Sequence, residues 1–508
     1  MAGIDCCINN KKRCDEVFFD SVNENIYVYG TGQYSRVLLS YMQLKGLESR
    51  IEGFIVTKMA NQQELFYGHC VHEFNQIEDK LTGKIVCIAI SEEKADGIKE
   101  KLQSAGVHEI VQFNETIYNE LEESLFAHYN AIEIQNKQVV VWNFWGLGYS
   151  DQCKYIAKRM HEADESVSIF WIVSTQGNYD FPEWITPIVI GTQDYYRVLC
   201  SSRLLVSNVN APSSVRFKRK EQYYIYTWHG IGPSKRIEWQ SPLHRKVVHF
   251  ERERVKERWA GADIMVAGSD FCHEVYRDSF LYDGKIENWG YPRNDVLFQP
   301  NDFREKVYKY FDIPQNKKIL LYAPTFRNEL INSGNEKRLA EIYDIDLGIV
   351  KEEIERRFAE EYVILYRFHH YVYRYVDISK YNQAGVDATF YPDMQELLVA
   401  SEVLITDYSS SMWDFSLTRK PIFLYYHDAE EYQEKYQGFY VFPDEYPYPK
   451  GHNMQELCCA IRHFDDELYQ NELDKWFKRF GTYDDGHATE RVVARMCDVM
   501  NNPSKYGK

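Results

Sequence analysis

Short apolar runs alternate with amphipathic or charged stretches along residues 24–115. Four of these runs are predicted as buried strands, and a Gly turn that opens a helix separates the first two. The strands are predicted at residues 25–30, 51–56, 84–90 and 109–113, and a charged helix at residues 91–106. Strands that alternate with helices predict a parallel sheet that is covered on both faces.

The same alternation returns twice after a polar helical connector at about residues 114–136. The second stretch predicts strands within residues 139–144, 168–173, 188–190, 203–208, 223–230 and 263–269, with a charged helical segment at about 241–260. The third predicts strands within residues 317–326, 362–369, 388–392, 402–410 and 420–426. Helices are predicted at residues 453–463, 466–480 and 487–500.

This order of elements predicts an α/β protein with three domains. A small, separate Rossmann-like domain is expected over residues 1–125, with no ligand assigned to it. Two further Rossmann-like domains are expected to face each other across a cleft, at residues 138–310 and 311–508, the second carrying the C-terminal helices. Open α/β sheets bind ligands at the carboxyl ends of their strands, so the polar and Gly-rich segments are expected there.

Composition narrows the class of protein. Among 508 residues, 44% are hydrophobic, and the net charge is −17. That charge argues against nucleic-acid binding and against global attraction to anionic lipid. The 11 cysteines show no zinc-type spacing, which favours reduced thiols. Neither a signal peptide nor an apolar run of membrane-spanning length is visible, so a cytoplasmic, peripheral protein is expected.

A Gly turn follows the first predicted strand. Gly30 and Gly32 occupy the first two glycine positions of a dinucleotide fingerprint, but Ser35 replaces the third. The second strand ends in Thr57 and Lys58 and lacks the carboxylate that would bind a nicotinamide dinucleotide. Hydride transfer is therefore disfavoured. A purely structural turn and a nucleotide or sugar-phosphate pocket both remain open.

The segment TWHG (227–230) leaves a predicted strand and enters a Gly/Pro loop. An imidazole with an ordinary pKa near 6.5 is suited to take a proton from an alcohol, so His229 is a candidate base. The alternative is a hydrogen-bonded structural histidine. The glycines and basic residues nearby support the functional role, which then weighs about as much as the structural one.

Three more strand ends carry candidate anion-binding groups. Arg327 ends YAPTFR, and its planar fork of donors suits a phosphate or pyrophosphate. His369 and His370 follow another strand, and one of them is expected to donate to a phosphate oxygen. The sharpest signal is TDYSSS (406–411), where a carboxylate and three serines stand where a helix is predicted to begin. Serine capping alone is the alternative there.

A basic stretch interrupts the acidic background at residues 216–220. Together with Lys235 and Arg236, its Lys218 and Arg219 are predicted to contact an anionic membrane or a polyanionic acceptor. An ordinary solvated face is the alternative for these cations.

Taken together, these motifs resemble the CDP-glycerol:poly(glycerophosphate) glycerophosphotransferase family, the teichoic acid polymerases and primases. The resemblance covers about residues 138–498, and its segments occur in the family's order. They are residues 227–236, 268–280, 290–295, 322–327, 367–370, 406–415, 419–432 and 485–492. Two segments depart from the family pattern. Ile231-Gly232-Pro233 bears on acceptor or polyol preference, and the doubled histidine leaves the register between His369 and His370 open.

The resemblance implies a GT-B fold, with an acceptor-side and a donor-side domain, in an enzyme at the inner face of the membrane. It aligns His229 with the proposed base and His369 with a second histidine region. Donor-binding positions correspond to Arg327, His370, Thr406, Asp407, Ser409 and Ser410. Residues 1–125 lie outside it and more loosely resemble the N-terminal domain of sugar O-acyltransferases.

The predicted activity is transfer of a polyol phosphate, with CDP-glycerol as the expected donor and CMP as the leaving group. The acceptor is expected to be a teichoic acid or capsular polymer, free or lipid-linked, and no essential metal is expected. CDP-ribitol or a nucleotide sugar are alternative donors, and a scaffold protein with a decayed site is the non-enzymatic alternative. Polymerase and primase activities share these motifs, so the sequence does not separate them.

Overall fold

The computed structural model describes residues 24–59, 64–177, 179–210, 218–230, 234–242, 252–299, 301–327, 330, 335–369 and 372–506. The chain divides into two compact units. Unit 1 comprises residues 1–134, 172–176 and 187–201, and unit 2 comprises residues 135–171, 177–186 and 202–508.

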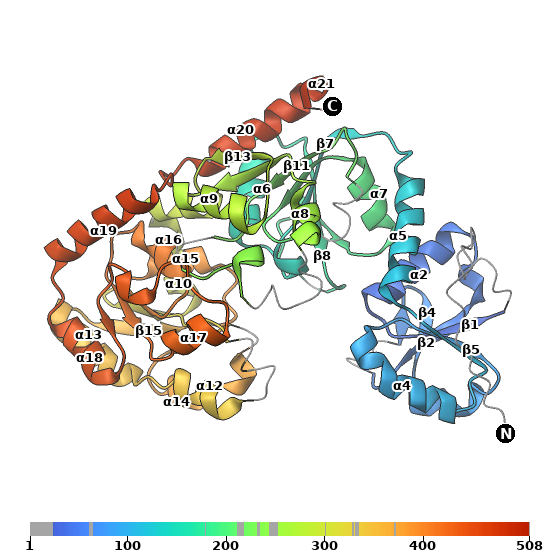
Figure 1. The fold of residues 1–508 in the computed structure, drawn as a ribbon, viewed down its shortest axis with the longest axis horizontal. Coiled ribbons are helices and arrows are strands. Elements are labelled where there is room, and N and C mark those ends of the chain that lie inside the picture. Colours follow the sequence, from blue (N-terminus) through green and yellow to red (C-terminus); the bar gives the residue numbers. More distant parts are fainter. Residues whose placement is uncertain are drawn as a thin grey trace. The chain divides into compact units, whose positions relative to one another are not determined.

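Unit 1 contains a six-stranded sheet in the order β3-β4-β2-β1-β5-β6, parallel except for the β3–β4 hairpin. Its strands are β1 (Ile26–Tyr29), β2 (Ile51–Val56), β3 (Leu65–Phe66), β4 (His69–Glu73), β5 (Ile85–Ile88) and β6 (Glu109–Gln112). Its helices are α2 (Gln33–Leu44), α3 (Phe74–Ile77), α4 (Glu92–Ser104), α5 (Glu115–Tyr129) and α7 (Gln193–Ser201). Helix α2 packs against α5, while Ile77, Ala95 and Leu102 of α3 and α4 join a core with β1, β2 and β5 (Figure 1).

Unit 2 is built around two further sheets, ordered β13-β12-β11-β10-β7-β8-β9 and β16-β15-β14-β17-β18-β19, although the last residues of β8 and β9 fall within the ranges of unit 1. The strands of the first are β7 (Gln135–Trp142), β8 (Ser168–Val173), β9 (Ile185–Val189), β10 (Ser202–Ser207), β11 (Tyr223–Tyr226), β12 (Ile264–Ala267) and β13 (Lys285–Asn288). Those of the second are β14 (Lys318–Tyr322), β15 (Tyr362–Tyr366), β16 (Val386–Asp387), β17 (Val403–Thr406), β18 (Ile422–Tyr425) and β19 (Lys450–Gly451). The inner strands β11, β12, β14 and β17 are buried along most or all of their length, as expected where helices cover a parallel sheet, whereas the edge strand β13 carries exposed polar residues.

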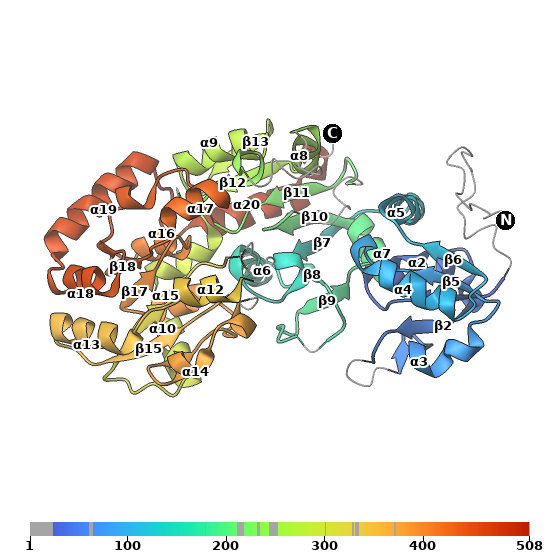
Figure 2. The same cartoon turned by 60° about the horizontal axis from the view of Figure 1, so that its bottom comes forward.

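Helices flank both sheets of unit 2 (Figure 2). They are α6 (Asp151–Ala163), α8 (Arg252–Trp259), α9 (Asp270–Ser279), α10 (Asn301–Tyr310), α12 (Glu336–Ile342), α13 (Leu347–Phe358), α14 (Ile378–Asn382), α15 (Met394–Ala400), α16 (Ser411–Ser416), α17 (Ala429–Lys435), α18 (Met454–Arg462), α19 (Asp466–Phe480), α20 (Ala488–Asn501) and α21 (Pro503–Tyr506). Two 3-10 segments matter for the site, η3 (Phe144–Gly146) and η8 (Pro292–Phe298). Helix α19 packs on α16 through Trp476, whose ring centroid lies 6.2 Å from that of Trp413, whereas α20 returns to pack on α6 and η8.

The predicted strands are largely confirmed, with one clear error. Residues 168–173 are a strand and residues 466–480 a helix with the predicted bounds. Residues 388–392 are not a strand, because Asp387 and Ala388 bend the chain into turns: the Asp387 carboxylate accepts from the Thr389 amide (2.8 Å), and the Ala388 carbonyl from that of Tyr391 (3.1 Å). The strand there is the two-residue β16, which ends at Asp387.

Each sheet reverses its strand order once, and that point is where open α/β sheets bind ligands. In unit 1 the reversal falls between β1 and β5, in the β7 sheet between β7 and β10, and in the β14 sheet between β14 and β17. Polar residues follow the strands at both reversals in unit 2. Asn143 and Asn208 are hydrogen-bonded to each other (2.7 Å), and the Asp407 carboxylate accepts from the Thr325 amide (2.8 Å).

Candidate active site

His229 lies three residues beyond the end of β11, in a loop with an unusual backbone. Trp228 has φ of 54° and Gly230 has φ of 97°, both in the left-handed region. A Cβ on Gly230 would lie 1.8 Å from Nη2 of Arg293, so no other residue fits there without moving that side chain. The loop therefore depends on glycine for the close approach of Arg293.

The ring of His229 is held from several sides. Its Nδ1 lies 3.0 Å from the carbonyl oxygen of Asn208, and its centroid lies 4.0 Å from that of Trp228 and 5.4 Å from that of Phe144. Because a carbonyl only accepts hydrogen bonds, Nδ1 must carry the proton. In the neutral imidazole, Nε2 is then the basic nitrogen.

Burial among these rings lowers the pKa of His229 to about 4. The Asn208 carbonyl and the Asp151 carboxylate act in the opposite direction, and the nearby cations Arg293 and Lys235 lower the pKa further. The imidazole is therefore neutral throughout the physiological range. A neutral His229 can accept a proton, which is the state that a general base requires.

Arg293, from η8, joins the His229 loop to the β14 sheet. The guanidinium is buried and donates to Oδ2 of Asp151 (2.5 Å), to the His229 carbonyl (2.5 Å) and to Oδ2 of Asp414 in α16 (2.7 Å). The amide groups of Asn294 and Gln395 donate to the same Asp414 carboxylate. One side chain thus fixes the histidine loop relative to the start of α16.

Asp151, Arg293 and Asp414 were not among the predicted site residues. They come from three elements that are far apart in the chain, and only the fold brings them together. The available signal was that Arg293 and Asp414 lie inside two of the matching motifs, 290–295 and 406–415. Their residue types alone did not distinguish them from ordinary surface charges.

Arg327 occupies a different environment from the predicted one. It is 1% exposed, and its guanidinium binds the carboxylates of Asp428 (2.9 Å) and Asp407 (3.0 Å). The Tyr408 hydroxyl donates to Asp428 as well (2.7 Å). In this structure Arg327 therefore does not face an open phosphate site, and instead holds the Asp407 loop in place.

The remaining predicted donor-side residues differ in accessibility. Thr406 is buried, and its hydroxyl donates to the Ala323 carbonyl (2.6 Å). Ser409 and Ser410 are half-buried directly before α16, and Ser409 Oγ accepts from the Ser411 hydroxyl (2.8 Å). His369 is exposed and stacks on Phe326 with ring centroids 4.6 Å apart. His370 lies outside the described residues, as do Ile231, Gly232 and Pro233.

The four predicted surface cations lie in two pairs. Lys218 precedes β11, and its ammonium is bound to Asp263 (2.8 Å), while Arg219 pairs with Glu221 (3.4 Å). Lys235 and Arg236 follow the opposite end of β11, where Arg236 donates to the Phe439 carbonyl (2.9 Å). The strand β11 thus separates the two pairs, and their contact with an anionic membrane or a polyanionic acceptor stays a prediction.

The predicted N-terminal turn is closed by its own residues. The Ser35 hydroxyl is buried and donates to the Gly30 carbonyl (2.9 Å). Gly30 has φ of 114°, and a Cβ there would lie 2.8 Å from the Ile90 side chain. Gly32 caps α2 without a side-chain hydrogen bond. Gly30 and Ser35 thus have a structural role in this turn.

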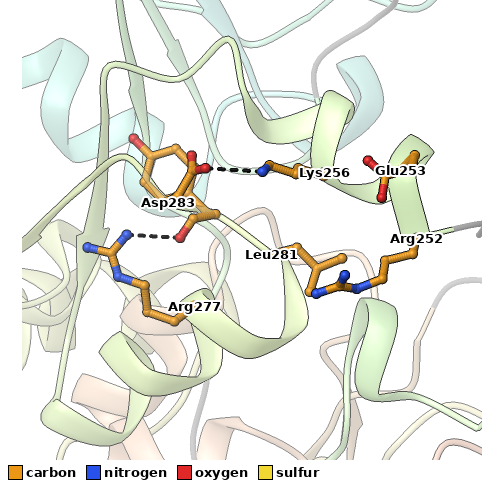
Figure 3. Close-up of a pocket in the computed structure, with 7 residues that line it drawn as sticks. Arg252, Glu253, Lys256, Arg277, Leu281 and Asp283 are labelled. Atoms are coloured by element: carbon orange, nitrogen blue, oxygen red, sulfur yellow. Dashed lines mark hydrogen bonds and ion pairs between the residues drawn. The ribbon is translucent and has the colours of Figure 1, made fainter.

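Three further observations bear on the chemistry. Within the described ranges, no three His, Cys, Asp or Glu side chains are grouped as they would be around a metal ion. Likewise, no described helix has the length and apolar character needed to cross a membrane. A pocket of about 360 Å³ lies between α8, α9 and the turn after α9, and Figure 3 shows the residues that line it. Its Lys256 is paired with Asp283 (3.2 Å), and its Arg277 donates to the Tyr282 and Gly284 carbonyls, so these cations already have partners.

Comparison with known proteins places this geometry in a family. Residues 125–498 match the family described as CDP-Glycerol:Poly(glycerophosphate) glycerophosphotransferase. The chain is 29% identical over 377 residues to a teichoic acid poly(glycerol phosphate) polymerase of Staphylococcus epidermidis, covering 71% of this chain and 50% of the relative. It is 26% identical over 394 residues to a teichoic acid glycerol-phosphate transferase of Staphylococcus aureus, covering 74% and 97%.

A solved structure shares the fold. The wall teichoic acid polymerase TagF is 26% identical, with a TM-score of 0.64 over 80% of this chain and 98% of that one. The chain spans about half the length of the S. epidermidis polymerase, so the match covers one part of that protein. The family match extends over most of the chain and includes every candidate residue of unit 2, from Asp151 to Asp428. The chain therefore belongs to the CDP-glycerol:poly(glycerophosphate) glycerophosphotransferase family.

Proposed function

We propose that the chain transfers glycerol phosphate from CDP-glycerol to the terminal hydroxyl of a polymer and releases CMP. The observation that carries this proposal is the neutral His229, whose Nδ1 faces the Asn208 carbonyl and whose Nε2 is therefore basic. We further propose a GT-B architecture, in which the β7 sheet forms the acceptor side and the β14 sheet the donor side. The two sheets with strand-order reversals support that assignment.

In the proposed step, Nε2 of His229 takes the proton of the acceptor hydroxyl. The hydroxyl oxygen forms a bond to the β-phosphorus of CDP-glycerol, and the bond from that phosphorus to the bridging oxygen of the pyrophosphate breaks. CMP leaves with the bonding electron pair. Negative charge on the phosphoryl oxygens is then stabilised by fixed donors, which is how proteins generally accelerate phosphoryl transfer.

On the donor side we assign Ser409 and Ser410 as hydrogen-bond donors to the phosphates, because both are half-buried at the reversal of the β14 sheet. His369 is assigned as a second, accessible donor. Arg327 acts through Asp407, since its guanidinium is enclosed by carboxylates. These groups are neutral or exposed, so part of the phosphate charge is assigned to Lys235, a cation close enough to His229 to lower its pKa. Arg293 is not assigned this role, because Asp151 and Asp414 already enclose its guanidinium.

The acceptor in this proposal is a teichoic acid or capsular polymer, free or lipid-linked, met at the inner face of the cell membrane. Transfer is expected to need no essential metal. Two measurements address these points. Flotation with vesicles containing anionic lipid tests membrane association, and assays after EDTA treatment test the metal, because an activity that EDTA abolishes and Mg²⁺ restores contradicts the metal-free scheme.

The donor is tested by incubating the chain with CDP-glycerol, CDP-ribitol and a UDP-sugar, each with a short poly(glycerol phosphate) acceptor. CMP release and product length are measured. The expected result is release of CMP from CDP-glycerol. Faster release from CDP-ribitol would reassign the polyol, and release of UDP alone would make the chain a glycosyltransferase.

The base is tested by His229→Ala. Transfer is expected to fall by about 10²- to 10⁴-fold, the usual contribution of a general base, while CDP-glycerol binding measured by calorimetry stays within about twofold. His463→Ala is the matched control, because His463 is exposed on the surface of unit 2. Turnover of His229→Ala close to that of the control would contradict the assignment of His229.

A further inference from the structure

Unit 1 contains a cavity that the transfer reaction does not use. It has a volume of about 550 Å³ and lies at the carboxyl ends of β1, β2 and β5. Its lining residues are Tyr29, Gly30, Thr31, Val56, Thr57, Ile90, Lys94, Gly97, Ile98 and Lys101. The volume falls within the range of about 300–1,000 Å³ that is typical of small-molecule sites.

The cavity coincides with the reversal of strand order in this sheet. The chain runs from β1 through β2 to β4 on one side, and then returns to β5 and β6 on the other. The crevice between β1 and β5 is therefore the place where an open parallel sheet binds a ligand. Gly30 and Ile90, which follow these two strands, form part of the wall.

The charges of the lining residues have one sign. Lys94 and Lys101 on α4 contribute two exposed ammonium groups, and none of the lining residues that the structure describes carries a carboxylate. Within the described part of the chain, neither lysine forms an ion pair with an acidic side chain. In a chain of net charge −17, a cavity whose described charged lining residues are both cations favours an anionic ligand.

Hydroxyl and apolar groups complete the lining. Tyr29 and Thr57 are hydrogen-bonded to each other (2.8 Å), and the Thr31 hydroxyl lies beside the start of α2. That helix has no acidic residue in its first turn, and its N-cap makes no side-chain hydrogen bond. Val56, Ile90 and Ile98 supply an apolar surface. The lining therefore suits a ligand with an anionic end and a flat apolar part.

Gly97 is an independent indication that the space is kept open. It lies in the interior of α4, where glycine is destabilising relative to alanine. A Cβ at this position would meet no heavy atom within 4 Å, so the packing of α4 does not require a glycine. Lys94 and Lys101 flank Gly97 on the same helical face. The missing side chain leaves room between the two cations.

We propose that this cavity binds a nucleoside monophosphate or diphosphate, with Lys94 and Lys101 at the phosphates and the base against Val56, Ile90 and Ile98. A nicotinamide dinucleotide is not the ligand, because β2 is followed by Thr57 and Lys58 rather than by a carboxylate for the ribose hydroxyls. The site is independent of the proposed transfer reaction.

The test is calorimetric titration of the full chain with CMP, CDP, UMP, UDP, AMP, ADP, GMP and GDP. Three variants are compared with the unmodified chain: Gly97→Leu, which fills the cavity, the charge-reversed double variant K94E/K101E, and the control Lys99→Glu, an exposed lysine of α4 outside the cavity. At least one nucleotide is expected to bind the unmodified chain and Lys99→Glu equally, and to bind the other two at least tenfold more weakly. Gly97→Leu is expected to unfold at no lower temperature.

Two results would overturn this proposal. One is nucleotide binding that is the same in all four proteins, which would leave the transferase site as the only nucleotide site. The other is inorganic phosphate displacing the nucleotide at equal concentration, which would show that the base contributes nothing. CDP-glycerol transfer is measured in parallel and is expected to be unchanged, so failure of this proposal and failure of the proposed function give different results.

Discussion

At the scale of single residues, the candidate base is defined by its neighbours more than by its own type. Trp228 and Gly230 adopt left-handed backbone conformations on either side of His229, and for a residue with a bulky side chain such as Trp228 this costs about 1–3 kcal/mol. The contact between Arg293 and the His229 carbonyl holds that conformation. The strain thus coincides with the residue that the proposed chemistry uses.

The pH dependence of transfer follows from the environment of His229. Burial lowers the pKa to about 4, so the basic form is expected to persist down to about pH 5 rather than being lost near 6.5. The measurement is kcat/KM for the acceptor between pH 4.5 and 8, with circular dichroism to confirm folding at each pH. An acid limb centred near 6.5 would contradict the burial argument.

The lowered pKa of His229 also makes the free energy of unfolding depend on pH. In the unfolded chain the histidine titrates near 6.5, so between about pH 6.5 and 4 the unfolded state binds more protons at this site than the folded state does. The contribution of His229 to the free energy of unfolding is therefore complete above 6.5 and decreases as the pH falls towards 4.

At the scale of elements, buried charges connect the two sheets of unit 2. The Lys154 ammonium of α6 binds Asp393 (2.5 Å) and Glu396 (2.7 Å) at the start of α15. Arg293 of η8 connects to α16 through Asp414 (2.7 Å). Such pairs add little net stability compared with apolar packing, but removing one partner leaves an uncompensated buried charge. These pairs therefore fix the position of α6 relative to α15 and of η8 relative to α16.

Arg293→Met tests this connection. It leaves the Asp151 and Asp414 carboxylates without their cation, and is expected to lower the free energy of unfolding by about 3–5 kcal/mol. Arg356→Met is the matched control, since its exposed pair with Glu353 is worth about 0–1 kcal/mol. Urea denaturation measures both.

A double variant separates loss of the pair from loss of packing. When Asp414→Asn is added to Arg293→Met, one of the two unpaired carboxylates disappears, so part of the stability is expected to return. Burial raises the pKa of Asp414, which agrees with a cost for its charged form. A double variant less stable than Arg293→Met would show that packing, not charge, dominates at this position.

Much of the element order could be predicted from sequence, whereas the pairing of side chains could not. Apolar runs such as those of β14 and β17 identify strands because a parallel sheet buries both faces. The strand predicted at residues 388–392 is wrong because the Asp387 carboxylate accepts a hydrogen bond from the Thr389 amide, and the chain turns there. The sequence also did not show that Lys218 and Lys235 lie at opposite ends of β11.

For the candidate site residues, too, the position in the chain could be predicted but the side-chain partners could not. His229 could be proposed because it follows a strand and precedes glycine. The role of Arg293 depends on Asp151 and Asp414, which a linear pattern does not connect with it. The enclosure of Arg327 by Asp407 and Asp428 is likewise a result of tertiary packing. Residue type predicted an affinity for anions, and the fold determined which anion each arginine binds.

At the scale of the whole molecule, helix α20 follows the second sheet of unit 2 in the chain but packs beside the first. Helix α20 packs against α6, η8 and β7, and Val492 and Met496 are fully buried. Met496→Ala is expected to cost about 2–5 kcal/mol, because it leaves a cavity in this packing. Glu490→Ala, on the exposed face of α20, is the control and is expected to change stability by less than about 0.5 kcal/mol.

Hydrogen exchange locates the effect. In Met496→Ala, faster exchange is expected in α6 and β7, which lie far from residue 496 in the chain but contact α20. Exchange in β14 and β15 is expected to change less. Uniform acceleration across both sheets would show that unit 2 opens only as a whole.

The return of α20 to the first sheet has a consequence for how the protein is made. On a ribosome that adds about 5–20 residues per second, β7 and α6 emerge tens of seconds before the helix that covers them. Throughout that interval the surface that later receives Val492 and Met496 is exposed on the nascent chain. The first sheet of unit 2 can reach its native packing only once α20 has left the ribosome. Chaperone binding during translation should therefore concentrate on α6 and β7. A translation product that stops before α20 should be the species that aggregates.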